Sequence, residues 1–170
     1  MTARALAGRG APEAERARVL LVCTGGGHLL QLWSLRAAWD GYSHAWVVAS
    51  HEGTDVASLL EGERVYLAHS PASRNVKNLV RNLVLARRLL TRLRPDVVLT
   101  TGAAVAVPFA WIARARGIRV AYVESLARAE RPSLSCRLVA PVANRVYVQW
   151  PELAAAIPGA RYAGTVFGEP

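Results

Sequence analysis

Lysine is almost absent from this chain of 170 residues: Lys77 is the only one, so arginine supplies nearly all of the positive charge. Cysteine is equally scarce. Cys23 and Cys136 stand far apart, outside any Cys-x-x-Cys pair and with no histidine pair nearby, which argues against a metal site. No Asp-x-Asp sequence occurs that could hold a divalent cation. We therefore expect no bound metal, and we expect both cysteines to be buried thiols in a reducing compartment.

Long apolar runs are missing as well. A helix that spans a bilayer needs about 18 consecutive apolar residues, and the nearest candidate, 97–115, is interrupted by Pro108. Residues 1–18 are rich in arginine and alanine and contain no apolar stretch, so they fit neither a secretory signal nor a membrane anchor. We expect residues 1–18 to be a flexible tail and residues 19–170 to form a single domain.

The composition is that of a folded, basic protein. Apolar residues make up 52% of the chain, which excludes a disordered protein and fits a large buried sheet. The net charge of +9 and the pI near 10.7 favour an anionic partner. A bias toward GC-rich codons would produce the same arginine excess, and no helix-turn-helix, RNA-binding or zinc motif is present. We therefore expect no nucleic-acid partner.

Short apolar runs alternate with helical patterns along the whole chain. The runs are continuously apolar and do not alternate with polar residues, which is typical of strands buried on both faces of a parallel sheet. The sequence therefore predicts a doubly wound, mostly parallel, Rossmann-like α/β sheet. The predicted strands are 19–23, 45–49, 64–68, 95–100, 118–123, 145–148 and 162–166, and the predicted helices are 29–38, 54–60, 76–93, 106–116, 133–140 and 152–156.

In sheets of this kind, ligands bind in the crevice outside the carboxyl ends of the strands. That rule selects the residues that directly follow each predicted strand as candidates for a site. These are residues 24–28, 50–51, 69–75, 101–104, 124–125 and 149–152.

A glycine-rich turn follows the first strand. Gly25, Gly26 and Gly27 let the backbone approach a ligand, and the helix that follows adds a partial positive charge suited to a diphosphate. The turn is not a dinucleotide fingerprint, because Leu30 stands where the third glycine should be. His28 opens the helix, where the dipole disfavours the charged imidazole, so the neutral ring could accept a proton. A plain glycine turn with a surface histidine is the alternative.

Three further strand ends carry candidate side chains. Glu124, followed by Ser125, could place a carboxylate in the crevice to bind sugar hydroxyls or act as a base, or it could cap the next segment. Thr101 and Gly102 form another turn that opens a helix, with room for a ligand or for close helix packing. The segment Gln149–Glu152 reads in isolation only as a strand-to-helix turn.

The long helix predicted at 76–93 carries a row of basic residues on one face. A basic amphipathic helix can rest on anionic headgroups, with about 1 kcal/mol from each basic residue near the surface. The alternative is the solvated outer face of an ordinary crossover helix. The basic residues are Lys77, Arg81, Arg88 and Arg92, and the face predicted to pack on the sheet contains Leu79, Leu83, Ala86, Leu90 and Leu93.

Four of these segments occur together in a specific order: Gly25–His28, 95–102, 122–125 and 148–152. In order and spacing they resemble the membrane-recruiting subunit of the two-subunit N-acetylglucosaminyltransferase of asparagine-linked glycosylation, and its bacterial PssD-like relatives in exopolysaccharide synthesis. The resemblance covers residues 19–166. The Gly-Gly-Gly-His and Glu-Ser motifs are also similar to the N-terminal half of the single-chain enzyme that adds N-acetylglucosamine to the peptidoglycan lipid precursor.

The resemblance implies the N-terminal, acceptor-side half of a GT-B glycosyltransferase. The acceptor would be a lipid-diphosphate-linked sugar, the donor a UDP-sugar held mostly by a separate subunit, and no cofactor would be needed. His28 and Glu124 would be catalytic or substrate-binding, and the glycine turn would face the substrate phosphates. The remaining substrate-binding candidates are Thr101, Gly102, Ser125, Gln149 and Glu152.

The same resemblance implies an inverting hexosyltransferase, active only in a hetero-complex at the cytoplasmic face of a membrane. Eukaryotic members begin with a spanning helix that this sequence does not show, so membrane contact would be peripheral or through the partner. The alternative is a non-catalytic scaffold that recruits the catalytic subunit to the membrane and presents the acceptor, with His28 and Glu124 only shaping the pocket.

Overall fold

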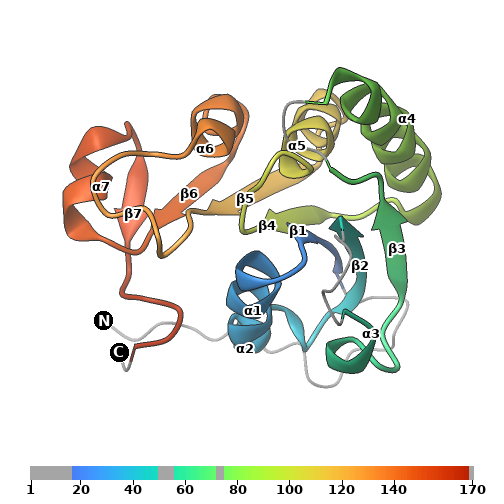
Figure 1. Ribbon diagram of the computed structural model, residues 1–170, viewed down its shortest axis with the longest axis horizontal. Helices are drawn as coiled ribbons and strands as arrows, with labels where there is room; N and C mark the ends of the chain where they lie inside the picture. Colours follow the sequence, from blue (N-terminus) through green and yellow to red (C-terminus); the bar gives the residue numbers. More distant parts are fainter. Residues whose placement is uncertain (1–16, 50–55, 72–74, 169–170) are drawn as a thin grey trace.

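The computed structural model describes residues 17–49, 56–71 and 75–168. Its strands form one seven-stranded sheet in the order β3-β2-β1-β4-β5-β6-β7, and every neighbouring pair is parallel (Figure 1). The order reverses between β1 and β4, which is where doubly wound sheets form their binding crevice. The strands are β1 (Arg18–Thr24), β2 (Ser43–Ala49), β3 (Val65–Ala68), β4 (Val97–Thr100), β5 (Arg119–Val123), β6 (Arg145–Val148) and β7 (Ala160–Tyr162).

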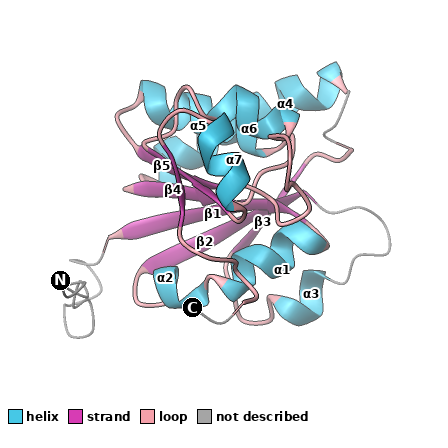
Figure 2. Ribbon diagram, turned by 90° about the vertical axis from the view of Figure 1, so that its left-hand side faces the viewer, coloured by secondary structure: helices cyan, strands magenta, loops and turns pink. Residues whose placement is uncertain are grey.

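Helices cover the sheet on both faces and create two separate cores (Figure 2). One core lies under α4, α5 and α6, and the other lies under α1 and α2, where Trp39 and Trp46 meet edge to face with ring centroids 5.2 Å apart. This architecture confirms the predicted fold class. The helices are α1 (Gly27–Ser34), α2 (Arg36–Trp39), α3 (Val56–Leu59), α4 (Val76–Leu93), α5 (Ala106–Ala115), α6 (Leu134–Val139) and α7 (Pro151–Ala156).

Two predicted elements differ from the structure. The single helix expected at 29–38 is two helices, because Leu35 takes a φ of −82° and ψ of 16° and ends α1. The strand expected at 162–166 is instead β7, which ends at Tyr162, because Gly164 has a positive φ of 93° and turns the chain away from the sheet. The helix start predicted at Thr54 and the strand-end residues Ser50 and His51 lie outside the described residues.

The inward face of α4 is not the one that the leucine spacing predicts. Ala86 and Leu90 are buried as expected, but Leu79 and Leu83 are 42% and 45% exposed. Asn78 and Asn82 are buried in their place. The prediction for Leu79 and Leu83 is therefore wrong, and α4 presents apolar side chains to solvent.

The buried asparagines of α4 satisfy the backbone that follows β3. Asn82 accepts from the His69 N–H at 2.8 Å and donates to the His69 carbonyl at 3.0 Å. Asn78 donates to the Pro71 carbonyl at 3.0 Å. Backbone groups that a packed helix shields from water need such partners, and leucine could not provide them.

Two further observations bear on the predictions from composition. Cys23 and Cys136 are buried free thiols, and burial raises the pKa of Cys136 to about 12. Within the described residues, no helix combines the length and the apolar character needed to cross a membrane.

Candidate functional site

The turn after β1 and the turn after β4 are joined through His28 and Thr101. The His28 Nδ1 lies 2.8 Å from the Thr101 carbonyl oxygen, and the Thr101 hydroxyl donates to the His28 carbonyl at 2.8 Å. These two turns flank the reversal point of the sheet, so the structure brings the predicted residues His28 and Thr101 together where a ligand is expected.

This contact fixes the proton on the imidazole of His28. A carbonyl oxygen can only accept, so Nδ1 carries the hydrogen and Nε2 of the neutral ring has a free lone pair. Nε2 makes no hydrogen bond within the described part of the chain. Burial lowers the pKa of His28 below its ordinary value, and the charge of Arg128 acts in the same direction, while the Thr101 bond and Glu124 oppose the shift. The ring is therefore neutral and able to accept a proton near pH 7.

The glycines of the site have different structural roles. Gly26 caps α1 at a φ of 78°, and both Gly26 and Gly27 are exposed at the start of the helix. The Gly25 N–H donates to the Ala49 carbonyl at 3.0 Å, so it is not free for an anion. Gly102 has a φ of 103°, and a Cβ at that position would lie 2.6 Å from the Tyr122 hydroxyl, so only glycine fits.

Glu124 is almost completely enclosed, with 1% of its surface exposed. Its carboxylate accepts from the backbone N–H groups of Ser125 and Ser133, both at 2.8 Å, and from the Ser133 hydroxyl at 2.9 Å. The Tyr122 hydroxyl adds a longer bond of 3.3 Å. The carboxylate thus closes the loop between β5 and α6, and no edge of it reaches the surface.

Two glutamines connect the carboxyl ends of the strands, which we call the carboxyl edge, to the segment that follows β7. The Gln149 amide donates to the Gln31 side chain at 2.8 Å and to the Glu124 carbonyl at 2.9 Å. Its oxygen accepts from the Val166 N–H at 2.9 Å. Gln31 accepts from the N–H of Leu126 at 2.9 Å. Gln149, a predicted site residue, is therefore a buried connector of the site.

Sequence reasoning missed Gln31, Ser133 and Arg128. Gln31 follows His28 by three residues on α1, a spacing that places both on one face of a helix, so it could have been found. Ser133 caps α6 by accepting from the Cys136 N–H, a pattern visible in sequence, but its bond to Glu124 is not. Arg128 gave no local signal.

The other predicted residues lie apart from this network or at its rim. The Ser125 hydroxyl oxygen accepts a long hydrogen bond of 3.5 Å from the Gln31 amide nitrogen, at the rim of the site. Glu152 is exposed in the first turn of α7 and makes no ion pair within the described residues. The four basic side chains of the predicted row on α4 are all exposed, as a surface role requires: Lys77, Arg81, Arg88 and Arg92. Among the described residues, no His, Cys, Asp and Glu side chains gather closely enough to hold a metal ion.

Replacing Glu124 by glutamine should destabilise the fold by about 2–3 kcal/mol. The amide nitrogen of glutamine cannot accept, so at least one buried backbone N–H of Ser125 or Ser133 loses its partner. The shift is measured by urea unfolding. The exposed Glu61→Gln is the matched control and should change stability by no more than about 0.5 kcal/mol. Equal stability of both variants would contradict the anchoring role.

The fold of this chain is similar to parts of several solved structures. The chain superimposes on MurG from Acinetobacter baumannii with a TM-score of 0.71 at 19% identity, covering 90% of this chain and 47% of MurG. It superimposes on a UDP-N-acetylglucosamine 2-epimerase from Rickettsia bellii with a TM-score of 0.70 at 14% identity, covering 89% of this chain and 46% of the epimerase. The chain thus shares a Rossmann-like fold with the matched part of each protein and covers about half of its length.

Sequence comparison is more specific. The chain is 28% identical over 181 residues to the UDP-N-acetylglucosamine transferase subunit ALG14 of Yarrowia lipolytica, covering 90% of this chain and 82% of the relative. It is 28% identical over 177 residues to the subunit of the same name from Rattus norvegicus, covering 87% and 82%. A family model described as oligosaccharide biosynthesis protein Alg14 like matches residues 20–166, which include every candidate of the carboxyl edge. The chain therefore belongs to the Alg14-like family of oligosaccharide biosynthesis proteins.

Proposed function

We propose that this chain is the acceptor-side subunit of an inverting glycosyltransferase. The enzyme transfers a sugar from a UDP-sugar to a lipid-diphosphate-linked acceptor in glycan synthesis. N-acetylglucosamine is the first sugar to test, because the relatives are named UDP-N-acetylglucosamine transferase subunits. The observation that carries the proposal is the 2.8 Å contact between His28 Nδ1 and the Thr101 carbonyl, which leaves Nε2 free to act as a base.

The chemistry follows from that free nitrogen. The acceptor hydroxyl gives its proton to His28 Nε2 while its oxygen forms the new bond to the anomeric carbon of the donor. The bond from that carbon to the nucleoside diphosphate breaks, the diphosphate leaves with the electron pair, and the configuration inverts. The exposed start of α1 at Gly26 and Gly27 faces phosphate oxygens. Glu124 holds the β5–α6 loop, so it positions the site and does not act as the base.

The donor is assigned to a second subunit. The chain spans about half of the two-domain proteins that it resembles, so it supplies one wall of an interdomain cleft. Large aromatic side chains are exposed toward the end of the chain, and such residues are enriched at protein interfaces. They are Trp150, Tyr162 and Phe167, which are 37%, 47% and 57% exposed.

A transfer assay tests the function. The chain is assembled with a donor-binding subunit and supplied with radiolabelled UDP-N-acetylglucosamine and a synthetic lipid-diphosphate sugar. We expect label in the organic phase, with an inverted anomeric configuration by NMR. Transfer with retained configuration, or hydrolysis of the donor without transfer, would overturn the proposal.

We further propose that α4 and α5 rest on the cytoplasmic face of a membrane. The basic row of α4 adjoins an apolar stripe in which Val76 and Val80 are 75% and 53% exposed. Beside that stripe lies a groove of about 540 Å³ between α4 and α5, and Trp111 in its wall is 48% exposed. Apolar side chains next to cationic ones fit the boundary between acyl chains and anionic headgroups. The groove is lined by Leu83, Val84, Arg87, Trp111, Ile112, Ala115 and Arg116.

Vesicle binding should require anionic lipid and weaken as salt rises. Reversing two charges in Arg81→Glu with Arg88→Glu should lower the partition coefficient by at least about 30-fold, at about 1 kcal/mol per basic residue. Co-sedimentation with phosphatidylserine vesicles measures this effect. Arg145→Glu with Arg161→Glu removes the same charge from exposed positions on β6 and β7 and should have a much smaller effect. Equal losses in both pairs, or equal binding to neutral vesicles, would contradict the assignment.

A further inference from the structure

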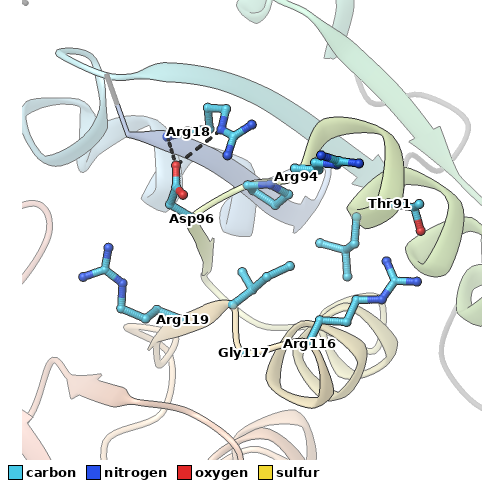
Figure 3. Close-up of a pocket in the computed structure, with 10 residues that line it drawn as sticks. Arg18, Thr91, Arg94, Asp96, Arg116, Gly117 and Arg119 are labelled. Carbon is cyan, nitrogen blue, oxygen red and sulfur yellow. Dashed lines mark hydrogen bonds and ion pairs between the residues drawn. The ribbon is translucent and has the colours of Figure 1, made fainter. Parts of the chain in front are cut away.

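A second group of charged residues lies at the amino ends of the strands, on the side of the sheet opposite to the carboxyl ends where His28 lies. There the first residues of β1, β4 and β5 meet the last turns of α4 and α5 around a pocket of about 530 Å³ (Figure 3). β1 runs from this edge to the glycine turn, so the two sites are about 20 Å apart. We call it the arginine pocket, and its lining is Arg18, Leu90, Thr91, Arg94, Pro95, Asp96, Arg116, Gly117, Ile118 and Arg119.

The lining contains four guanidinium groups but only one carboxylate to balance their charge. Asp96 accepts from the Arg18 backbone N–H at 2.8 Å and from its Nε at 3.4 Å, and the backbone bond is the largest cause of the lowered pKa of Asp96. Arg116 donates to the Arg87 carbonyl at 3.1 Å. Arg94 and Arg119 make no ion pair or side-chain hydrogen bond within the described residues. The charge of Arg119 contributes to the lowered pKa of Asp96, so this carboxylate interacts with both Arg18 and Arg119. Among the described residues, the Arg94 guanidinium has no carboxylate of its own.

The helix ends around the pocket do not cancel this excess. α4 and α5 both end here, and each C-terminus carries a partial charge of roughly −0.5. Together with Asp96 they offset about two of the four positive charges. Arg94 also has a left-handed φ of 46° at the end of α4, a position where glycine is the usual residue. The chain thus holds an arginine in an unfavourable backbone conformation beside three other arginines.

We infer that the arginine pocket binds a phosphate group. A guanidinium presents a planar fork of N–H donors that matches two phosphate oxygens. Arg94 and Arg116 line the pocket from the C-caps of α4 and α5, and Arg119 lines it from β5. In Figure 3 the Arg94 and Arg116 guanidinium groups lie on one side of the pocket and that of Arg119 on the other. A doubly charged phosphomonoester matches the excess charge of the lining. The site is distinct from the carboxyl edge and does not depend on the transfer reaction.

The position of the pocket gives two possible sources for the phosphate. Arg116 lines both the pocket and the apolar groove between α4 and α5, and Thr91 lines both the pocket and the hollow beside Arg88 and Arg92. The arginine pocket is therefore continuous with the surface proposed to meet the membrane. A lipid headgroup phosphate reaches it from that side, and a soluble phosphate reaches it from solvent.

Calorimetric titration of the full chain with inorganic phosphate at low ionic strength tests the soluble source. We expect one saturable site, and at least a tenfold weaker affinity in the Arg94→Gln, Arg119→Gln double variant, which corresponds to about 1.4 kcal/mol. The control, Arg145→Gln with Arg161→Gln, should bind within twofold of the parent chain. Thermal unfolding verifies each fold, and Arg119→Gln alone, which leaves the α4 cap intact, replaces the double variant if that variant unfolds.

Vesicles test the lipid source. Phosphatidic acid carries a phosphomonoester and phosphatidylserine a phosphodiester, so vesicles of both types are compared at equal surface charge. A preference for phosphatidic acid that disappears in Arg94→Gln, Arg119→Gln supports the site and identifies a headgroup. Phosphate binding in solution without that preference supports the site and identifies a soluble ligand. Absence of both, or equal losses in the control pair, overturns the inference whatever the transfer assay shows.

Discussion

Replacing His28 by alanine should lower turnover of the assembled enzyme by at least about 100-fold, the usual contribution of a general base. The reason is the loss of Nε2, whose lone pair is kept available by the Nδ1 bond to the Thr101 carbonyl. Turnover is measured as kcat for transfer with saturating donor and acceptor, on complexes whose assembly is verified by size exclusion.

The His28→Asn variant distinguishes a catalytic role of His28 as a base from a purely structural role. The asparagine amide can donate to the Thr101 carbonyl much as Nδ1 does, but it offers no group that accepts a proton near pH 7. A catalytic base predicts that His28→Asn is as slow as His28→Ala, with unchanged acceptor KM. Recovery of turnover in His28→Asn would instead favour the non-catalytic scaffold.

The pH dependence gives an independent check of the same residue. Burial lowers the pKa of His28 below 6.5, so the neutral, active form dominates above that value and is lost as the pH falls through the lowered pKa. The kcat/KM profile should therefore be flat from about pH 7 upward and decline on the acid side with a midpoint below 6.5. A midpoint above 6.5 would contradict the assignment.

Most strands, and the meeting of two strand-end turns in the candidate site, could be predicted from the sequence because both follow from local signals. A strand buried on two faces must be apolar throughout, and β1 and β2 are visible as such runs. Their carboxyl ends then select the turns at Gly25–His28 and Thr101, which the structure brings together. The glycine at 102 is also explained, since its φ and the nearby Tyr122 hydroxyl exclude a side chain.

The inward face of α4 could not be predicted, because its determinants are distant in sequence. Helical periodicity selects Leu79 and Leu83, but the loop after β3 packs against α4, and the His69 and Pro71 backbone groups there hydrogen-bond to Asn82 and Asn78. Unpaired buried backbone groups cost more than exposed leucines. Asn78 and Asn82 therefore turn inward, and the leucines face the surface proposed to meet the membrane.

The role of Glu124 was open for a similar reason. Its place at the end of β5 indicated a carboxylate in the crevice, and both a base and a cap were consistent with that position. The structure shows that the carboxylate of Glu124 accepts hydrogen bonds from the N–H and the hydroxyl of Ser133, which is nine residues further along the chain. A side chain that accepts several buried hydrogen bonds is held in one position, which suits a residue that orients the site.

The isolated 170-residue chain should transfer sugar at least about 1000-fold more slowly than the complex with a donor-binding subunit. In the proposed enzyme the carboxyl edge with His28 and Thr101 forms one wall of a cleft. The solved proteins that share this fold are about twice as long as this chain. A single wall cannot position the donor against the acceptor or exclude water from the reacting atoms. The prediction is checked by the same transfer assay, run on the chain alone and after addition of the second subunit.

The end of the chain is the expected contact for that subunit. Val166 is tied to Gln149 and through it to the site, so docking on the neighbouring Phe167 places the donor wall next to the carboxyl edge. Phe167→Asp should weaken the heteromer at least about tenfold, as expected for an exposed aromatic anchor. Leu67→Asp, on the edge strand β3 at the other end of the sheet, is the matched control and should assemble normally. Full transfer by the chain alone, as a monomer, would contradict the requirement for a second subunit.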